Sequence, residues 1–298
     1  MLRKSLMMTT VAVLLAVPAT ARDNALQMVS IDVEGGGGTL FVAPGGQSLL
    51  IDTANPDAST VTGDYPSSER IAAAAHALGV KKIDYLLTTH YHGDHIGGLE
   101  GLLKRMPIGT FIDHGENRET TASTRPGAAQ IDPKNPPPNS TAAGYIRYLS
   151  LIRGRKHIVA KAGDVFHIGA MTVTIVMADA KPLATALPGA GEDNAACAGM
   201  EPMANNGGEE NARSTSSVIS YGKVRIAAFG DLTWDREKDL FCPTDKVGKV
   251  DVYLATHHGT AMSGSPAAVN ALAPLVAIVG NSARKGADAQ RMKTIKAS

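Results

Sequence analysis

The sequence predicts an α+β sandwich, in which two sheets pack together in the interior and helices lie outside. Short strands separated by glycine-rich or Pro-Gly turns are expected at residues 26–33, 39–43 and 48–52. A helix, a buried strand and a second helix follow between residues 66 and 104. In addition, histidine and acidic residues recur directly after apolar strands, as is typical of a site built at the carboxyl edge of a sheet.

The helix predicted at residues 66–78 has a clear start, an apolar face and a clear end. Ser67 can cap its first turn, and Gly79 stops it. Its apolar face consists of Ile71, Ala74, Ala75 and Leu78. The apolar run at residues 83–87 is typical of a buried strand, and a helix is expected at residues 96–104.

The rest of the chain continues with strands, two helices and two long irregular stretches. Strands are expected at residues 108–112, 157–160, 163–168, 171–177, 216–221, 224–229, 252–256 and 274–279. Helices are expected at residues 141–153 and 266–272. Residues 118–140 and 178–213 are rich in proline, glycine and asparagine, which indicates loops laid over the surface. Residues 281–298 are polar, and we assign no element to them.

The first 21 residues have the pattern of a secretory signal peptide. Arg3 and Lys4 precede an apolar run from Leu6 to Val17, and an Ala-x-Ala sequence ends at Ala21. The run is shorter than the about 20 residues that span a bilayer, although an uncleaved membrane anchor is the alternative. We therefore predict a periplasmic or secreted protein, with residues 22–298 forming a single domain and no membrane segment after cleavage.

Charge and cysteine content limit the partners of the mature chain. The full sequence has 29 Lys+Arg and 28 Asp+Glu, and the first 21 residues include two of the basic residues and none of the acidic ones. The mature balance is therefore 27 against 28, which gives no support to strong non-specific binding of nucleic acid. Cys197 and Cys242 could pair in an oxidising compartment or remain two free thiols. The oligomeric state is left open.

Four potential metal ligands lie within six residues, directly after the buried strand at 83–87. They are His90, His92, Asp94 and His95. Imidazole and carboxylate groups suit zinc and related first-row metals. His90 and His92 can point the same way, while Asp94 and His95 face a position one step further on, so the spacing suits two adjacent metal ions.

Other candidate ligands also follow strands. They are His114, Asp231, His257 and His258. Asp52 also leaves a strand, and from the sequence alone its carboxylate could equally cap a helix or turn. If the carboxyl ends of these strands meet at one edge of two packed sheets, the candidates converge on one pocket. We expect the remaining histidines at 76, 157 and 167 to be structural or solvated.

The His-x-His-x-Asp-His pattern after an apolar strand resembles the signature of the metallo-β-lactamase superfamily of dinuclear metallohydrolases. The resemblance implies a four-layer αββα sandwich and two Zn²⁺ ions per chain. His90 and His92 would bind the first ion, Asp94 and His95 the second, and Asp231 would bridge them. His257 would complete the second site, His258 would donate to substrate, and Asp52 would orient the metal loop.

The sequence departs from the family pattern at the first metal. The family's third histidine for that metal, expected shortly before the bridging aspartate, has no match. The corresponding stretch, Glu210 to Ser214, offers Asn211 instead, as a substrate or orienting residue. Either His114 fills the vacant place from another strand, or the first metal is weakly held.

Three short motifs resemble one branch of the superfamily, the exported hydrolase domain of bacterial DNA-uptake (competence) channel proteins and related phosphorylcholine esterases. They are Asp32-Val33-Glu34-Gly35-Gly36, Phe229-Gly230-Asp231 and His257-His258-Gly259. In the family pattern a terminal helix or further strands would follow residue 279, so the resemblance leaves open that the chain is truncated at its C-terminus.

The function implied is that of an exported dinuclear hydrolase. A metal-bound hydroxide would attack an ester-type substrate, preferably phosphodiester-like, and Asp94 would accept the proton. A lactone or β-lactam is the alternative substrate. A non-catalytic metal- or ligand-binding protein on the same fold is the alternative from another class, because the third histidine is missing.

Overall fold

A computed structural model describes residues 24–59, 65–121, 129–198, 200 and 208–298. The signal peptide expected at residues 1–21 lies outside the described residues. Among those described, none of the helices combines the length and the apolar character needed to cross a membrane.

The first sheet combines an antiparallel meander with a parallel half. Its strand order is β1-β2-β3-β4-β5-β6. The first three strands pair antiparallel, as expected for chain segments joined by tight turns, and β3 to β6 pair in parallel. The bounds are β1 Gln27–Ser30, β2 Thr39–Val42, β3 Ser48–Ile51, β4 Ile83–Leu87, β5 Ile108–Asp113 and β6 Lys156–Val159.

The second sheet repeats this division. Its order is β13-β12-β11-β10-β8-β7, with β9 paired to β8. Strands β7, β8, β10 and β11 pair antiparallel, and β11, β12 and β13 pair in parallel. The bounds are β7 Val165–Ile168, β8 Met171–Ala178, β9 Lys181–Pro182, β10 Ser216–Tyr221, β11 Val224–Ala228, β12 Val252–Leu254 and β13 Val276–Ile278.

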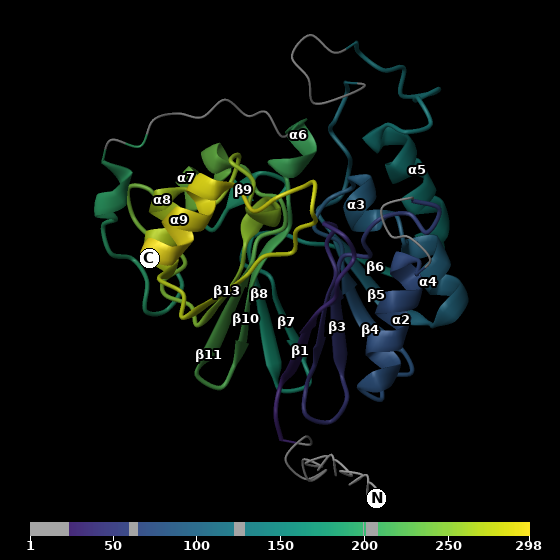
Figure 1. Cartoon of the computed structure of the whole chain (residues 1–298), viewed down its shortest axis with the longest axis horizontal. Helices are drawn as coiled ribbons and strands as arrows, with labels where there is room; N and C mark the ends of the chain where they lie inside the picture. Colours follow the sequence, from purple (N-terminus) through teal and green to yellow (C-terminus); the bar gives the residue numbers. More distant parts are fainter. Residues whose placement is uncertain (1–23, 60–64, 122–128, 199, 201–207) are drawn as a thin grey trace, which may run out of the picture.

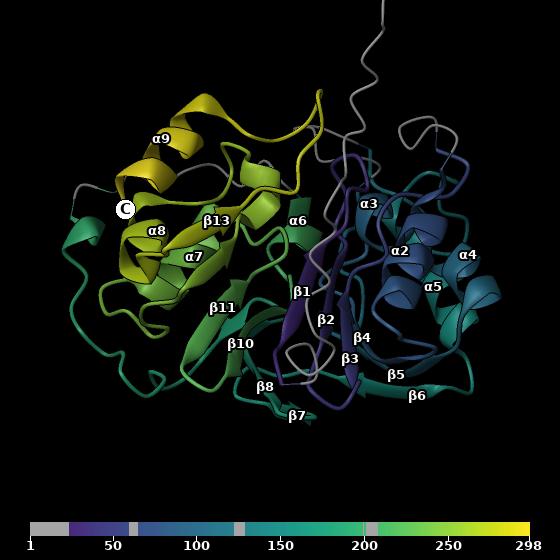
Figure 2. The ribbon, with the colours of Figure 1, turned by 60° about the horizontal axis from the view of Figure 1, so that its bottom comes forward.

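Helices cover the outer face of each sheet, so that the fold has four layers (Figure 1). On the first sheet lie α2 (Ser67–Ala77), α4 (Leu99–Arg105) and α5 (Thr141–Ile152). The short α3 (Gly93–Ile96), which comes between α2 and α4 in the chain, belongs to the metal loop. On the second lie α7 (Trp234–Phe241), α8 (Pro266–Leu272) and α9 (Ala289–Ala297), and Figure 2 shows the same separation from another side. The predicted α+β sandwich with four αββα layers is therefore confirmed.

Three apolar clusters fill the spaces between the layers. One joins helices α2, α4 and α5 to the first sheet, and includes Ile71, Leu102 and Tyr148. A second lies between the two sheets and includes Phe41 and Ile219. The third joins α7 and α8 to the second sheet. Burial of these side chains, worth about 1.5–3 kcal/mol for each large one, fixes the two sheets face to face.

Two elements in regions left without assignment complete the second half. Helix α7 packs Trp234, Leu240 and Phe241 inward. Helix α9 begins at Asp288, whose side chain accepts from the amides of Gln290 and Arg291. The irregular stretch 178–213 carries β9, a 3-10 turn η1 (Ala195–Cys197) and α6 (Gly208–Asn211).

A disulfide bond joins Cys197 to Cys242, which resolves the alternative that the sequence left open. It ties the irregular stretch before β10 to the residue that follows α7. Since the two cysteines are 45 positions apart in the sequence, the bond closes a large loop across the second half of the molecule.

Candidate metal centre

The carboxyl ends of the parallel strands bring the candidate ligands to one edge of the sandwich. Asp52 follows β3 and the metal loop follows β4 in the first sheet. Asp231 follows β11 in the second sheet, and the pair His257-His258 lies in the turn η2 (Thr256–Gly259) after β12. The two sheets therefore deliver imidazoles and carboxylates from segments far apart in the chain, as the sequence pattern predicted.

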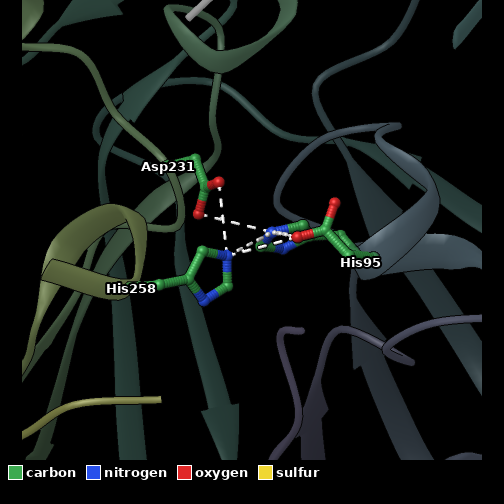
Figure 3. A group of neighbouring side chains, drawn as sticks. His95, Asp231 and His258 are labelled. Carbon is green, nitrogen blue, oxygen red and sulfur yellow. Dashed lines mark hydrogen bonds and ion pairs between the residues drawn. The ribbon is translucent and has the colours of Figure 1, made fainter. Parts of the chain in front are cut away.

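Four side chains form a compact group with ligand atoms within 4.8 Å of one another: Asp94, His95, Asp231 and His258. Figure 3 shows His95 entering from one side and Asp231 and His258 from the other. Nε2 of His95 lies 3.4 Å from Oδ2 of Asp94 and 3.3 Å from Oδ1 of Asp231. Nε2 of His258 lies 3.3 Å from Oδ2 of Asp94 and 3.5 Å from Oδ2 of Asp231. The two Nε2 atoms are 3.3 Å apart.

These separations are short enough for one metal ion to contact all four side chains. Ligand atoms held about 2.0–2.1 Å from a tetrahedral zinc ion are about 3.3 Å from one another. Five contacts in the cluster, at 3.3–3.5 Å, are close to that length, with Asp231 contributing Oδ1 to the contact with His95 and Oδ2 to the contact with His258. The donor set of two imidazoles and two carboxylates also suits zinc and related first-row metals.

The imidazoles in this cluster are oriented by hydrogen bonds at their outer nitrogens. Nδ1 of His95 lies 2.7 Å from Oδ2 of Asp52, and Nδ1 of His258 donates to the carbonyl of Gly280 at 2.7 Å. In both rings the outer contact engages Nδ1 and leaves Nε2 facing the cluster. Such contacts fix the tautomer and the ring direction of metal-binding histidines.

His90 and His92 form a second pair of inward-facing nitrogens. Nε2 of His90 lies 3.1 Å from Nδ1 of His92 and 3.9 Å from Oδ2 of Asp231. The outer nitrogen of His90 contacts the hydroxyl of Thr89, and Nε2 of His92 contacts Oε2 of Glu119 at 3.1 Å. These residues would hold the first metal, with Asp231 shared between the two positions.

The turn after β12 brings both of its histidines towards Asp231. Nε2 of His257 lies 3.3 Å from Oδ2 of Asp231, and its other nitrogen contacts Ser263. The sequence favoured His257 for the second metal and His258 for substrate, whereas the structure places His258 in the four-residue group. Both residues have left-handed backbones, with φ of 54° and 56°, a conformation that carries strain in non-glycine residues and is concentrated at functional sites.

His114 is buried with partners of its own. Its Nε2 lies 2.8 Å from Oε1 of Glu210, which also accepts from the amide of Tyr91, and its ring packs against Tyr91. Among the described residues, the structure gives no hydrogen-bond partner to Nδ1 of His114, Oε2 of Glu210 or Oδ1 of Asn211. The contacts of His114 therefore lie with Glu210, and His114 is not part of the compact group of Asp94, His95, Asp231 and His258.

The electrostatics of the cluster favour a cation. Burial would raise the pKa of the Asp94 carboxyl, but His95, His258 and Lys285 hold that pKa well below its usual range. Burial would also raise the pKa of Asp231, which His257 and His95 likewise hold well below its usual range. Burial opposes protonation of His258, but Asp231 and Asp94 raise its pKa to about 9. The carboxylates are thus ionised at neutral pH, and a metal ion would replace the proton on His258.

Small residues let the loops approach closely. A Cβ on Gly37 would lie 2.7 Å from both Oδ2 of Asp52 and Nδ1 of His95, so only glycine leaves room for that contact. The amide of Gly37 donates to the carbonyl of Asp94 at 2.9 Å, which fastens the glycine-rich turn to the metal loop.

Three residues near the centre were not anticipated from the sequence. Glu119 and Glu210 lie in stretches without local pattern, and Lys285, which forms an ion pair with Asp94, lies in the unassigned C-terminal stretch. The hydrogen bond of Ser282 to the carbonyl of Lys285, and that of Ala287 to the carbonyl of His258, place Lys285 on a turn against η2.

Comparison with known proteins agrees with this architecture. A model of the metallo-beta-lactamase superfamily matches residues 34–191. The beta-lactamase-like protein 2 homolog of Caenorhabditis elegans is 29% identical over 79 residues, which amount to 24% of this chain and 24% of that relative. The match thus spans about a quarter of the relative's length.

Two solved structures are also similar. The metallo-beta-lactamase fold protein YhfI from Bacillus subtilis has 15% identity and a TM-score of 0.39, with 77% of this chain and 70% of that chain covered. A metallo-beta-lactamase with a HARLDQ motif from Cronobacter sakazakii has 18% identity and a TM-score of 0.38, with 72% of this chain and 65% of that chain covered.

Proposed function

Because this chain belongs to the metallo-β-lactamase superfamily, we propose that it is an exported, dinuclear metal-dependent hydrolase of ester-type substrates, with phosphodiester-like compounds preferred. The observation that carries the proposal is the cluster of Asp94, His95, Asp231 and His258, whose candidate ligand atoms all lie within 4.8 Å of one another. His90 and His92 supply ligands for the first metal position, which shares Asp231 with that cluster.

Two metal ions, zinc in this proposal, would supply hydroxide at neutral pH by lowering the pKa of water to about 7. The chain's own residues then perform positioning and proton transfer. Asp94 is ionised and its side chain is 21% exposed, so it can accept the proton of the attacking water. Asp52 and Glu119 hold the rings of His95 and His92 in place.

Two observations support export. Residues 1–21 carry the signal-peptide pattern, and the Cys197–Cys242 bond suits an oxidising compartment such as the periplasm or the exterior. The assignment to the competence-channel branch rests on three sequence motifs alone. The partner we propose is a small ester substrate, and the mature charge balance favours no nucleic acid.

A substrate panel tests the reaction class. We expect the purified, zinc-loaded protein to hydrolyse a bis-aryl phosphate faster than a lactone or a cephalosporin, and the Asp231→Ala variant to lose this activity. Hydrolysis of the cephalosporin alone would overturn the phosphodiester preference and favour a β-lactamase.

A non-catalytic metal- or ligand-binding protein is the second candidate. It is favoured by the absence of the family's third histidine from the sequence before Asp231, which leaves His90 and His92 as the histidines of the first metal position. Metal analysis discriminates the two: less than one metal per chain, together with no hydrolysis of any panel member, favours the binding protein.

A further inference from the structure

Lys285 adds a positive charge to the edge of the metal centre. Its Nζ forms an ion pair with Oδ2 of Asp94. The same oxygen lies 3.4 Å from Nε2 of His95 and 3.3 Å from Nε2 of His258, so it faces the position that a metal ion would take. The side chain of Lys285 is 37% exposed, whereas those of His95 and His258 are 2% and 5% exposed. Lys285 therefore lies between the buried ligand candidates and the solvent.

The turn that carries Lys285 is fixed to the turn η2, which carries a ligand candidate. The amide of Ala287 donates to the carbonyl of His258 at 2.8 Å. Gly286 has a φ of 84°, and a Cβ at this position would lie 2.2 Å from the carbonyl oxygen of His258. Only glycine combines that backbone conformation with so close an approach. The backbone of Lys285 is therefore held against η2 and next to His258.

Helix α9 anchors the far end of this segment. Arg291 is buried, and its Nη1 donates to the carbonyl of Gly264 at 3.1 Å. Its guanidinium group also lies 4.8 Å from the centroid of the Trp234 ring. Figure 2 shows the segment between β13 and α9, in yellow, extending from the second half of the molecule towards the first. The backbone is thus fixed on both sides of Lys285, and only the flexible four-carbon side chain is left to move its ammonium group.

Metal binding changes what Lys285 can pair with. In the loaded protein, Oδ2 of Asp94 would be a metal ligand and would share its negative charge with the metal ion. The ion pair with Lys285 would then weaken, because the ammonium group and the metal ion repel each other across one oxygen. The ammonium group would stay close to Asp94, since its backbone is fixed. A negatively charged group of the substrate would be the partner available to it.

The space beside Asp94 suits a polar substrate. A cavity of about 1000 Å³ lies against this residue, which is at the upper end of the about 300–1,000 Å³ typical of ligand pockets. Charged side chains of α4 and α5 also line it, among them Glu100, Lys104 and Arg147. A substrate that reaches Asp94 from this cavity comes within reach of Lys285, because Lys285 contacts the same carboxylate.

We infer that Lys285 binds the negatively charged group of the substrate, and that it thereby selects anionic esters such as phosphodiesters over neutral esters and lactones. The inference rests on the proposed function, which places the ester bond at the metal centre. A phosphodiester carries a negative charge at neutral pH on the oxygens next to the bond that is cleaved, whereas a carboxylic ester or a lactone has no charge there. Lysine suits this role because it binds phosphate groups as a point charge.

The first measurement compares the binding of two probes that differ in charge, anionic dimethyl phosphate and neutral trimethyl phosphate, to the zinc-loaded protein by phosphorus NMR. We expect wild type to bind the anion at least tenfold more tightly than the neutral probe. Lys285→Met should raise the dissociation constant of dimethyl phosphate about tenfold and leave that of trimethyl phosphate within about twofold. Lys285→Arg, which keeps the charge, should restore most of the affinity.

Arg284→Met is the matched control. It removes a positive charge from an exposed position of the same turn, and its affinity for dimethyl phosphate should lie within about twofold of that of wild type. A thermal melt and a zinc analysis check that each variant is folded and loaded. Lys285→Met should hold zinc at least as tightly as wild type, because Lys285 competes for Asp94. Weaker binding of the anion in this variant therefore cannot come from an emptier metal centre.

The same titration without zinc tests the release of Lys285 from Asp94. Wild type should then bind dimethyl phosphate at least tenfold more weakly, because its ammonium group stays paired and no metal ion attracts the anion. Equal binding with and without zinc would contradict the inference.

The second measurement is hydrolysis of a bis-aryl phosphate and of a neutral aryl acetate. Lys285→Met should raise KM about tenfold for the phosphate and leave KM for the acetate within about twofold of wild type. Failure of wild type to bind dimethyl phosphate, equal affinity in wild type and Lys285→Met, or a parallel loss for both probes would overturn the inference. If the phosphate is hydrolysed while binding does not depend on Lys285, the proposed function stands and the inference fails. Binding that depends on Lys285 without any hydrolysis would support the inference and contradict the proposed function.

Discussion

Nδ1 of His95 lies 2.7 Å from Oδ2 of Asp52, while Nε2 of the same ring faces Asp231 from the second sheet. The same carboxylate accepts from the amide and the hydroxyl of Thr89 at 2.7 and 2.8 Å. Asp52 itself has a left-handed backbone, with φ of 61°. The buried carboxylate of Asp52 thus orients both Thr89, the residue before His90, and His95, the last histidine of the metal loop.

Replacing Asp52 by asparagine should weaken metal binding. We expect a loss of about 10- to 100-fold in zinc affinity, because the ring of His95 loses its charged acceptor. Competition against a chromogenic chelator measures the affinity. Asp32→Asn, at a side chain that is 78% exposed, is the control and should leave affinity unchanged. Equal affinity in Asp52→Asn and wild type would contradict the orienting role.

Replacing Glu119 by alanine should affect the first metal position selectively. Glu119 contacts Nε2 of His92 and also accepts from the hydroxyl of Thr141 at 3.1 Å. Without it, the ring of His92 is free to turn Nδ1 away from His90. We expect the zinc affinity of the first metal position, the weaker site, to fall about 10-fold or more. The affinity of the second position, the tighter site, should stay the same. Two-step chelator titration separates the sites, and a parallel loss at both would argue against this assignment.

Replacing His258 by alanine should cost more metal affinity than replacing His257. His258 contacts His95, Asp94 and Asp231, whereas the contacts of His257 are with Asp231 and Ser263. We expect about 100-fold loss for His258→Ala and about tenfold or less for His257→Ala. Zinc titration of the two variants measures the difference. The reverse order would restore the role that the sequence assigned to His257.

Removing the charge of Lys285 should strengthen metal binding. Lys285 forms an ion pair with Asp94, so it competes with a metal ion for that carboxylate. Its side chain is 37% exposed and solvent screens the pair, so we expect only a roughly three- to tenfold gain in zinc affinity for Lys285→Met. Arg284→Met, at the neighbouring exposed position, is the control. An unchanged or weaker affinity in Lys285→Met would show that Lys285 does not compete with the metal.

Local patterns in the sequence carried most of the fold and the core of the site. The apolar run before His90, the glycine before Asp231 and the helix at residues 67–77 each depend on neighbours a few residues away, which is why they could be recognised. The predicted cap of that helix was wrong, because its N-cap is Pro66 and Ser67 makes no capping hydrogen bond. The convergence of strand ends then followed from sheet geometry.

Contacts between distant segments could not be predicted in the same way. His257 is nearer the strand in the sequence, but two consecutive left-handed residues turn His258 into the cluster. The partners of His92 and Asp94, namely Glu119 and Lys285, come from loops that lie 27 and 191 residues away along the chain. Helix α7 was missed because the apolar residues Trp234, Leu240 and Phe241 lie among charged ones.

The central claim is that residues of both sheets hold metal ions in one shared centre. Metal content per chain, measured by mass spectrometry after zinc loading and dialysis, tests it most directly in wild type and Asp231→Ala. We predict two zinc ions per chain in wild type, and about one or none in Asp231→Ala, with loss of ester hydrolysis. Less than one zinc in wild type, or an Asp231→Ala variant that keeps both ions, would contradict the account.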